Sequence, residues 1–228
     1  MKTVAVIVAG GKGTRIEGKL PKQFTEIAGK PVVVYTLEKF ELCDSVDEIC
    51  LVVPEDFLSF SQEMVNKFHF KKLNKIIPGG EKRQDSVYKG LLAIPDNTSF
   101  VVVHDGVRPL VKVSKIKESI RLCKECKAVI LAVPVKETVK RVENLSVITT
   151  LNREKLWSIQ TPQTFDYILL VGAYKKAEED GFSGTDSSSL VERLGVEVKV
   201  LEGDYDNIKI TTKKDLIFAE EILKSSKK

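Results

Sequence analysis

The chain has 228 residues, of which 43% are hydrophobic and 30% charged. This apolar content excludes a disordered protein, and the length suits one α/β domain whose core needs no disulfide or metal for stability. Its 36 Lys and Arg residues exceed its 32 Asp and Glu residues by four, too mild a surplus to indicate a nucleic-acid partner. No apolar run approaches the ~20 residues of a membrane-spanning helix, and the glycines after the first apolar run argue against a signal peptide, so we expect a cytoplasmic protein without a membrane partner.

Apolar β-branched runs alternate with amphipathic stretches along the chain. In chain order they predict a strand at 3–9, a helix at 31–43, a strand at 48–54, a helix at 56–68, a strand at 74–78, a helix at 83–94, a strand at 99–105, a helix at 114–126, a strand at 128–135, helices at 167–180 and 187–194, strands at 196–203 and 207–210, and a helix at 212–225. Strands alternating with helices indicate an α/β, Rossmann-like fold, in which a mostly parallel twisted sheet is flanked by helices.

Residues 136–160 interrupt this regular series. They alternate polar and apolar residues and carry little helical periodicity. We therefore expect one or two exposed hairpins at 136–160, as an insertion within a single domain that spans residues 1–228.

Two of the four cysteines, Cys123 and Cys126, form a CxxC pair. Such a pair can be half of a zinc site, a redox pair or two reduced structural thiols. His69 and His104, the only histidines, are isolated, so a complete zinc ligand set is not evident. A redox pair opens a helix, whereas this pair ends one. We interpret both residues as reduced structural cysteines.

A glycine-rich turn follows the first predicted strand. After Ala9, the glycines Gly10, Gly11 and Gly13 let the backbone approach a ligand closely, and consecutive N–H groups in such a turn can bind an anion. The dinucleotide motif GxGxxG would need a glycine at Ile16, and the Walker sequence is also missing. The turn therefore predicts a phosphate-binding loop of another type.

Two cations follow these glycines. Arg15 can bind phosphate oxygens through two hydrogen bonds, and Lys22 comes after Pro21, which fixes the local turn. A structural turn with two solvated cations is the alternative. The order of strand, glycines and cations favours a positively charged site for a polyphosphate.

The segments AGGKGTR and LPKQF together resemble the signature of the 2-C-methyl-D-erythritol 4-phosphate cytidylyltransferases of the non-mevalonate isoprenoid pathway, within the nucleotide-diphospho-sugar transferase superfamily. The related ribitol-5-phosphate cytidylyltransferases share much of this pattern. The resemblance implies transfer of CMP from CTP to 2-C-methyl-D-erythritol 4-phosphate, which gives 4-diphosphocytidyl-2-C-methyl-D-erythritol and pyrophosphate.

Further segments resemble the same family in the same order. PGGEKRQDSVYKGL (78–91) is similar to its GG-x-x-R-x-x-S-V segment, and VVVHDGVRP (101–109) to its HDAARP segment, from which Gly106 and Val107 depart. The resemblance implies that the nucleotide is bound by Ala9, Gly10, Gly11, Gly13, Gly79, Gly80, Glu81, Ser86 and Asp105. We interpret His104 as structural, because in-line phosphoryl transfer needs positioned charge more than a proton shuttle.

The second half of the chain matches the acceptor side of the family. VPVKETVKRV (133–142) is similar to the start of a projecting β-arm, to which the irregular stretch 136–160 corresponds. In the family the threonine of this arm, here Thr138, reaches the site of a second subunit, so a homodimer is implied. GTDSSSLVERLG (184–195) departs from the family at Ser187, where an acidic residue is usual. The implied substrate-binding residues are Asp105, Arg108, Thr138, Arg153, Thr161 and Thr185.

The resemblance also implies the catalytic groups. These are Arg15, Lys22 and, in the segment EGDYDNIKITTKKDL (202–216), Lys209. Mg²⁺ or another divalent cation is the implied cofactor, with Asp105 as its candidate ligand. Cations and a metal suit a reaction that brings two anions together.

Three other functions remain open from the sequence. The acceptor could be ribitol 5-phosphate, since the nucleotide-side motifs do not separate the two polyol phosphates. A non-catalytic nucleotide-binding module would bind CTP without releasing pyrophosphate. A nucleic-acid binder is suggested only by the mild surplus of basic residues and lacks an aromatic platform.

Overall fold

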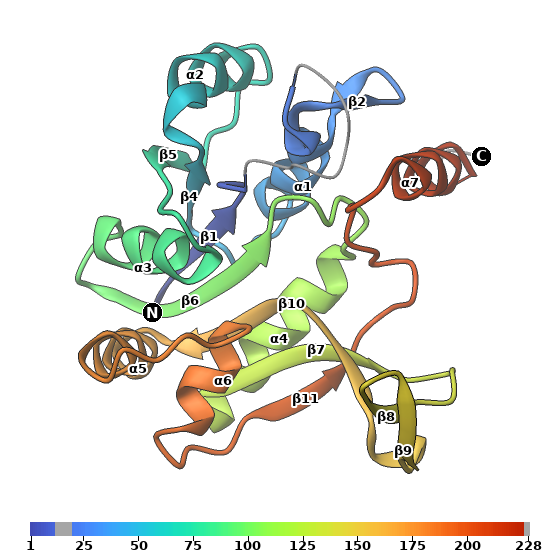
Figure 1. Cartoon of the computed structure of the whole chain (residues 1–228). Coiled ribbons are helices and arrows are strands. Elements are labelled where there is room, and N and C mark those ends of the chain that lie inside the picture. Colours follow the sequence, from blue (N-terminus) through green and yellow to red (C-terminus); the bar gives the residue numbers. More distant parts are fainter. Residues whose placement is uncertain (12–19, 226–228) are drawn as a thin grey trace.

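The computed structural model describes residues 1–11 and 20–225. A seven-stranded sheet with the order β11-β7-β10-β6-β1-β4-β5 forms its centre (Figure 1). The strands of this sheet are β1 (Lys2–Val8), β4 (Glu48–Val53), β5 (Leu73–Pro78), β6 (Thr98–Asp105), β7 (Ala128–Pro134), β10 (Trp157–Asp166) and β11 (Lys199–Glu202). Only the two pairings of β10, with β6 and β7, are antiparallel. The expected α/β fold with a mostly parallel sheet is confirmed.

Helices cover both faces of this sheet. One face packs against α1 (Val32–Glu41), α2 (Leu58–Asn66) and α4 (Val113–Cys126), and the other against α3 (Arg83–Ala93), α5 (Tyr167–Glu179) and α6 (Ser187–Glu192). Along β1, Val4 and Val6 face the α3 side, while Ala5 and Ile7 face the α1 side. Burial on both faces explains why this strand is an uninterrupted apolar run in the sequence.

The strand β10 was not predicted. The sequence pattern includes 157–160 in the irregular stretch and predicts no element at 161–166. Pro162 and the glutamines on either side of it argue against a central strand. The structure tolerates them because the pairing of β10 with β7 is interrupted between Ile159 and Gln163.

The strand expected at 207–210 is wrong. This extended segment lies outside the sheet, and Ile210 N donates a hydrogen bond to Val107 O at 2.9 Å. Its apolar pattern reflects packing of Ile210 against α7 (Lys213–Ser225) and the small hairpin β2 (Glu26–Ile27)–β3 (Lys30–Pro31).

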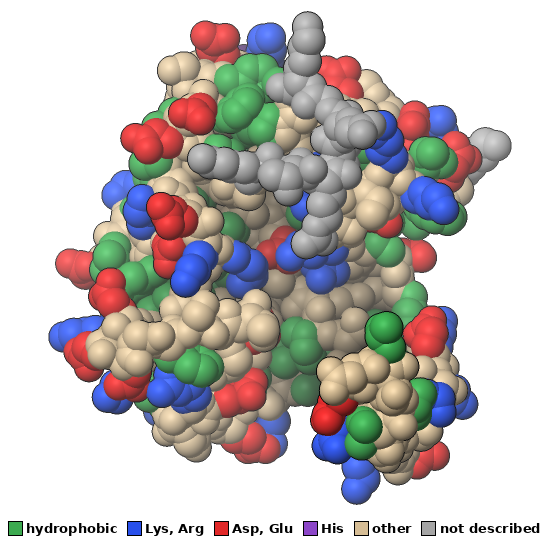
Figure 2. Space-filling model, in the orientation of Figure 1, with side chains coloured by type: hydrophobic (Ala, Val, Ile, Leu, Met, Phe, Trp, Pro, Cys, Tyr) green, Lys and Arg blue, Asp and Glu red, His purple; other side chains and the backbone are tan. Residues whose placement is uncertain are grey.

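The projecting β-arm is present as an antiparallel hairpin of β8 (Lys140–Glu143) and β9 (Ser146–Thr150), shorter than the expected 136–160. It extends away from the sheet as a separate lobe (Figures 1 and 2). Every residue of both strands is exposed, including apolar side chains at Val142, Val147 and Ile148.

Within the part of the chain that the structure describes, no helix has the length and apolar character needed to cross a bilayer.

Candidate active site

The carboxyl ends of β1, β4, β5 and β6 meet at one edge of the sheet. Ala9 N donates to Val52 O at 2.7 Å, and Gly106 N donates to Val8 O at 2.8 Å. In open α/β sheets this edge is where ligands bind. The turns that follow the strands therefore supply the candidate site.

Two glycine turns approach each other at this edge. A Cβ on Gly79 would lie 2.8 Å from Ser86 Oγ and 3.5 Å from the Cα of Gly10. A larger residue at Gly79 would separate the two turns. The expected nucleotide-binding residues from the two motifs are therefore neighbours in space.

Ser86 shapes the second glycine turn from inside. It is buried, and its Oγ accepts a hydrogen bond from Gly80 N at 3.0 Å while its hydroxyl donates to Lys82 O at 3.1 Å. Glu81, also expected to contact the nucleotide, is exposed at the rim of this turn.

Gln23 supports the first glycine turn and was missed by the sequence analysis. It lies in the short 3-10 helix η1 (Lys22–Phe24), is buried, and donates from Nε2 to Ala9 O at 2.7 Å and to Gly11 O at 3.0 Å. The sequence feature that could have indicated this role is the position of Gln23 in the LPKQF segment. The expected site residues Gly13 and Arg15 lie outside the described residues.

A cavity of about 140 Å³ opens beside the first glycine turn. Its cationic lining comes from three distant parts of the chain, namely Lys22, Arg83 and Lys209. Lys and Arg side chains also gather across the middle of this face in the space-filling view (Figure 2). A small cavity with backbone on one side and cations on the other suits a phosphate group.

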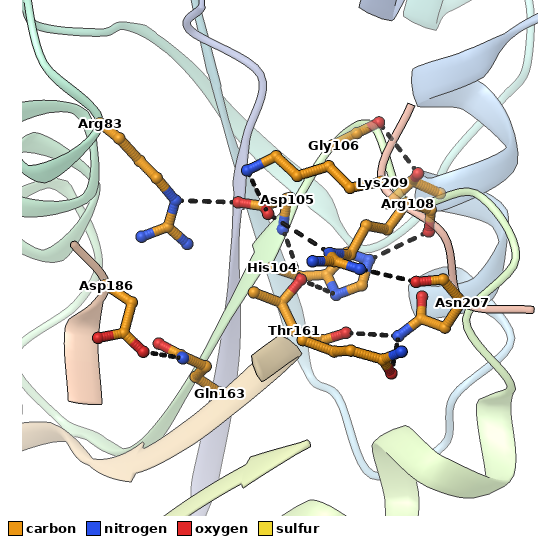
Figure 3. A network of polar contacts seen from close by, with 12 residues as sticks. Arg83, His104, Asp105, Gly106, Arg108, Thr161, Gln163, Asp186, Asn207 and Lys209 are labelled. Atoms are coloured by element: carbon orange, nitrogen blue, oxygen red, sulfur yellow. Dashed lines mark hydrogen bonds and ion pairs between the residues drawn. The ribbon is translucent and has the colours of Figure 1, made fainter. Parts of the chain in front are cut away.

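Three cations surround the carboxylate of Asp105, the last residue of β6 (Figure 3). Arg83 Nε lies 2.9 Å from Oδ1, Lys209 Nζ lies 2.9 Å from Oδ2, and Arg108 Nε lies 3.5 Å from Oδ2. Arg83 was missed as a site residue, although it stands in the GG-x-x-R-x-x-S-V segment. The structure thus brings together Asp105, Arg108 and Lys209, as expected, and adds Arg83.

The charges of this cluster fix the ionisation of Asp105. Burial raises the pKa of its carboxyl, but the opposing effects of Arg83, Lys209 and Arg108 are larger in sum and hold the pKa well below its usual range. One carboxylate cannot neutralise three cations. The cluster therefore retains a positive charge that can attract an anionic ligand.

His104 lies directly beneath this cluster and is fully buried. Burial lowers the pKa of its imidazole to about 3, so the ring is neutral. Its Nδ1 lies 3.0 Å from Thr161 Oγ1, and its Nε2 lies 3.2 Å from Arg108 O. These contacts agree with a structural role for His104.

The segment that carries Lys209 is held by a network of amides. Arg108 Nη1 donates to Asn207 O at 2.7 Å, and Asn207 Nδ2 donates to Gln160 Oε1 at 3.1 Å and to Thr161 O at 2.9 Å. Gln160 and Asn207 were not assigned from the sequence. They fix the backbone next to Lys209 so that its Nζ reaches Asp105.

A second cavity, of about 520 Å³, shares Asp105, Arg83, Arg108 and Lys209 with the cluster. Two expected substrate-binding residues, Thr161 and Thr185, also line it. This cavity therefore brings together part of the expected substrate-binding set, namely Asp105, Arg108, Thr161 and Thr185.

The rim of this second cavity is fixed by Asp186 and Gln163, neither of which was assigned from the sequence. Gln163 Nε2 donates to Asp186 Oδ2 at 2.6 Å, and Asp186 Oδ1 accepts from Ser189 N at 3.0 Å, which caps α6. Ser187, where the family usually has an acidic residue, is fully buried and lies 2.9 Å from the Tyr174 hydroxyl. The serine at position 187, where the family usually has an acidic residue, therefore packs beneath α6.

Thr138 and Arg153 are not brought into this cluster. Both are exposed at the base of the arm, where Arg153 Nη1 donates to Lys136 O at 2.8 Å. Neither contributes to the lining of the 140 or 520 Å³ cavity in the described part of the chain.

The cysteines do not form a metal site within residues 1–11 and 20–225, where no group of three or more His, Cys, Asp or Glu residues could hold a metal ion. Cys123 is fully buried, and burial raises the pKa of its thiol to about 12. A buried neutral thiol is unreactive, which supports the interpretation of Cys123 as a structural cysteine.

The comparisons with known proteins agree with this geometry. The family model described as 2-C-methyl-D-erythritol 4-phosphate cytidylyltransferase matches residues 3–225. Curated relatives with that name include one from Alkaliphilus oremlandii, 45% identical over 226 residues, which cover 98% of this chain and 96% of the relative. Another, from Caldanaerobacter subterraneus subsp. tengcongensis, is 46% identical and covers 98% of this chain and 100% of the relative.

Solved structures show the same fold over the whole length. The 4-diphosphocytidyl-2C-methyl-D-erythritol synthase of Anaerococcus prevotii has a TM-score of 0.87 at 34% identity, with coverage of 98% of this chain and 96% of that chain. The 2-C-methyl-D-erythritol 4-phosphate cytidylyltransferase of Francisella tularensis has a TM-score of 0.83 at 32% identity. With glycine turns, cations and two cavities at one sheet edge, this chain belongs to the 2-C-methyl-D-erythritol 4-phosphate cytidylyltransferase family of nucleotidyltransferases.

Proposed function

We propose that this chain transfers CMP from CTP to 2-C-methyl-D-erythritol 4-phosphate, releasing pyrophosphate and forming 4-diphosphocytidyl-2-C-methyl-D-erythritol. The observation that carries the proposal is the cation cluster around Asp105, which lies between a glycine-lined cavity and a larger polar one. The family and its curated relatives support the same reaction.

The reaction is an in-line attack by the acceptor phosphate on the α-phosphorus of CTP. The P–O bond to the new diphosphate forms while the bond to the pyrophosphate leaving group breaks. The attacking oxygen is already an anion, so no strong base is required, and the barrier comes from bringing anions together. Lys22, Arg83 and Lys209 line the cavity where that charge would develop, and Arg15 remains a predicted fourth cation.

On the nucleotide side, we propose that the turn around Gly79, Gly80 and Ser86 binds the cytosine. This turn lies beside Gly10 of the first glycine turn, which supports a nucleotide that contacts both turns. On the acceptor side, Arg108 and Thr185 line the 520 Å³ cavity, where a guanidinium and a hydroxyl suit a polyol phosphate.

Mg²⁺ fits this site as an ion held mainly by substrate phosphates. Mg²⁺ is commonly bound by one or two carboxylates together with phosphates and water, and among the residues that the structure describes Asp105 is the one carboxylate that lines both cavities. When bound, the ion supplies positive charge to the α-phosphate and to the leaving pyrophosphate. Asp105 would hold it, at the expense of part of its contacts with the three cations.

We further propose that the enzyme works as a cytoplasmic homodimer of one domain each, with the arm completing the partner's site. The apolar side chains of the exposed hairpin support an interface there. Thr138 and Arg153 lie at the arm base and, within the described residues, line neither the 140 nor the 520 Å³ cavity, as expected if they act in trans. The four free cysteines suit a reducing compartment.

A pyrophosphate-release assay tests this function. The purified chain is supplied with CTP, UTP, ATP or GTP in turn, with either 2-C-methyl-D-erythritol 4-phosphate or ribitol 5-phosphate. Release with CTP and the erythritol acceptor is expected, and chelation of divalent cations should abolish it. Faster turnover of ribitol 5-phosphate would reassign the acceptor, and CTP binding without release would indicate a non-catalytic module.

A further inference from the structure

A buried chain of hydrogen bonds lies under the turn that carries Asp105 and Arg108 (Figure 3). Asp105 N donates to Thr161 Oγ1 at 3.0 Å, Thr161 Oγ1 lies 3.0 Å from His104 Nδ1, and His104 Nε2 lies 3.2 Å from Arg108 O. This series of hydrogen bonds therefore begins at the backbone of Asp105 and ends at the backbone of Arg108.

The directions of these bonds follow from their end groups. The carbonyl of Arg108 only accepts, so His104 Nε2 must carry a hydrogen. In the neutral ring Nδ1 is then the acceptor, and the Thr161 hydroxyl donates to it. Thr161 Oγ1 keeps a lone pair for Asp105 N–H. Every donor in this series of hydrogen bonds has one acceptor. Of the two neutral tautomers of the imidazole, only the one with its hydrogen on Nε2 is compatible with these bonds.

This network braces both ends of a tight turn. Arg108 N also donates to Asp105 O at 3.0 Å, which closes the turn on its other side. The imidazole is fully buried and lies 5.0 Å from the ring of Phe40, measured between ring centroids. The ring therefore has little freedom to move.

The braced turn sets the position of two charged side chains. From it, Arg108 reaches both Asp105 Oδ2 and the carbonyl of Asn207. A shift of the turn would move the carboxylate and the guanidinium together, away from Lys209 and from the 520 Å³ cavity. Small displacements of this kind can cost large factors in rate.

We propose that His104 and Thr161 are positioning residues, which hold Asp105 and Arg108 in the geometry needed for the acceptor phosphate. This inference rests on the proposed function and deepens it. His104 acts through the backbone of the turn, as a neutral ring with its hydrogen on Nε2. It exchanges no proton with the substrates.

Removing the Thr161 hydroxyl tests the proposal. Thr161→Val should lower kcat about 10- to 100-fold and raise the KM for the acceptor, with little change in the KM for CTP. Thr161→Ser retains the hydroxyl and should restore most of the activity.

Thr164→Val is the matched control. Thr164 lies on the same strand, is also buried, and bonds to Ser119 Oγ at 2.9 Å, away from the cluster. It should show a similar loss of thermal stability with kcat close to wild type. Equal losses of kcat in Thr161→Val and Thr164→Val, or no gain from Thr161→Ser, would overturn the positioning role.

Heteronuclear NMR of the ligand-free wild-type chain gives a readout that does not depend on activity or on a variant that folds poorly. At neutral pH the His104 ring should show the hydrogen on Nε2 and an unprotonated Nδ1. A hydrogen on Nδ1 would contradict the proposed network. If the wild type shows the expected tautomer but no turnover, the proposed function fails while the hydrogen-bond chain stands.

Discussion

At the scale of single residues, the site depends on charges that arrive from separate elements. Arg83 comes from α3, Arg108 from the turn after β6, and Lys209 from the segment before α7. Their mutual repulsion is reduced by Asp105 and would fall further when phosphates bind. The cluster is thus arranged for an anionic ligand rather than for stability alone.

Lys209→Ala should lower kcat about 10²- to 10³-fold, because a positioned cation at the reacting phosphates is lost. The KM for CTP should change much less, and Lys22→Ala should behave in the same way. Lys199→Ala is the control, since Lys199 pairs with Glu197 at 2.6 Å on the exposed surface. Near-wild-type turnover in both site variants, measured by pyrophosphate release, would refute this mechanism.

The stability contributed by Asp105 should depend on pH. The folded pKa of its carboxyl lies below the unfolded value of about 3.9, so its contribution is fully present above that value and is lost as the pH falls below it. Asp105→Asn removes this titration. In urea unfolding, the free energy of unfolding of the wild type should therefore exceed that of Asp105→Asn by an amount that is constant near neutral pH and decreases below about pH 4. An advantage that does not change with pH would contradict the assigned ion pairs.

At the scale of elements, α3 carries Arg83 and Ser86 and must lie close to the sheet. Gly90 makes this possible, because a Cβ there would lie 2.5 Å from Val6 Cγ1 and 3.3 Å from Val52 Cγ2. Both valines belong to central strands that are buried on two faces. The helix therefore cannot accept a side chain at Gly90 without moving its site residues.

Gly90→Ala should destabilise the fold by roughly 1–3 kcal/mol through overpacking, and should also reduce activity by displacing α3. Gly172→Ala is the matched control in α5, where a Cβ would have no atom within 4 Å. It should stabilise the fold by about 0.5–1 kcal/mol, because alanine favours a helix over glycine. Urea unfolding measures the free energy of unfolding of both variants. Equal changes in the two would show that packing of α3 against β1 does not explain the effect of Gly90→Ala.

At the scale of the whole molecule, the arm projects from the sheet, and both strands of its hairpin are exposed. Its hairpin exposes apolar side chains, and Thr138 and Arg153 at its base do not line the 140 or 520 Å³ cavity in the part of the chain that the structure describes. A two-fold dimer would bury this surface and bring both residues to a partner's site.

Mixing inactive subunits tests this arrangement. Lys22→Ala removes a cation from the body of one subunit, and Thr138→Ala alters the arm of the other. After subunit exchange, about a quarter of the wild-type activity should return, because half of the dimers are mixed and each holds one intact site. Failure to recover activity, with exchange demonstrated by tagged subunits, would show that the arm does not act in trans.

The sequence indicated most of the elements because their patterns are local. Apolar β-branched runs marked β1, β4, β5, β6 and β7, and helical spacing marked the helices. The strand β10 escaped because Pro162 and buried glutamines are unusual in a central strand. The segment 207–210 was taken for a strand because apolar alternation alone does not distinguish sheet pairing from packing against a helix.

The sequence by itself determined the fold class and the family, and it predicted the glycine turns and the candidate site residues. Only the tertiary structure decided that Arg83, Arg108 and Lys209 share one carboxylate, and that His104 and Thr161 brace the turn beneath it. The physical reason is that periodicity and motif spacing report on neighbours along the chain. Which charges and hydrogen bonds meet at the sheet edge depends on strand order and packing, which only the folded chain fixes.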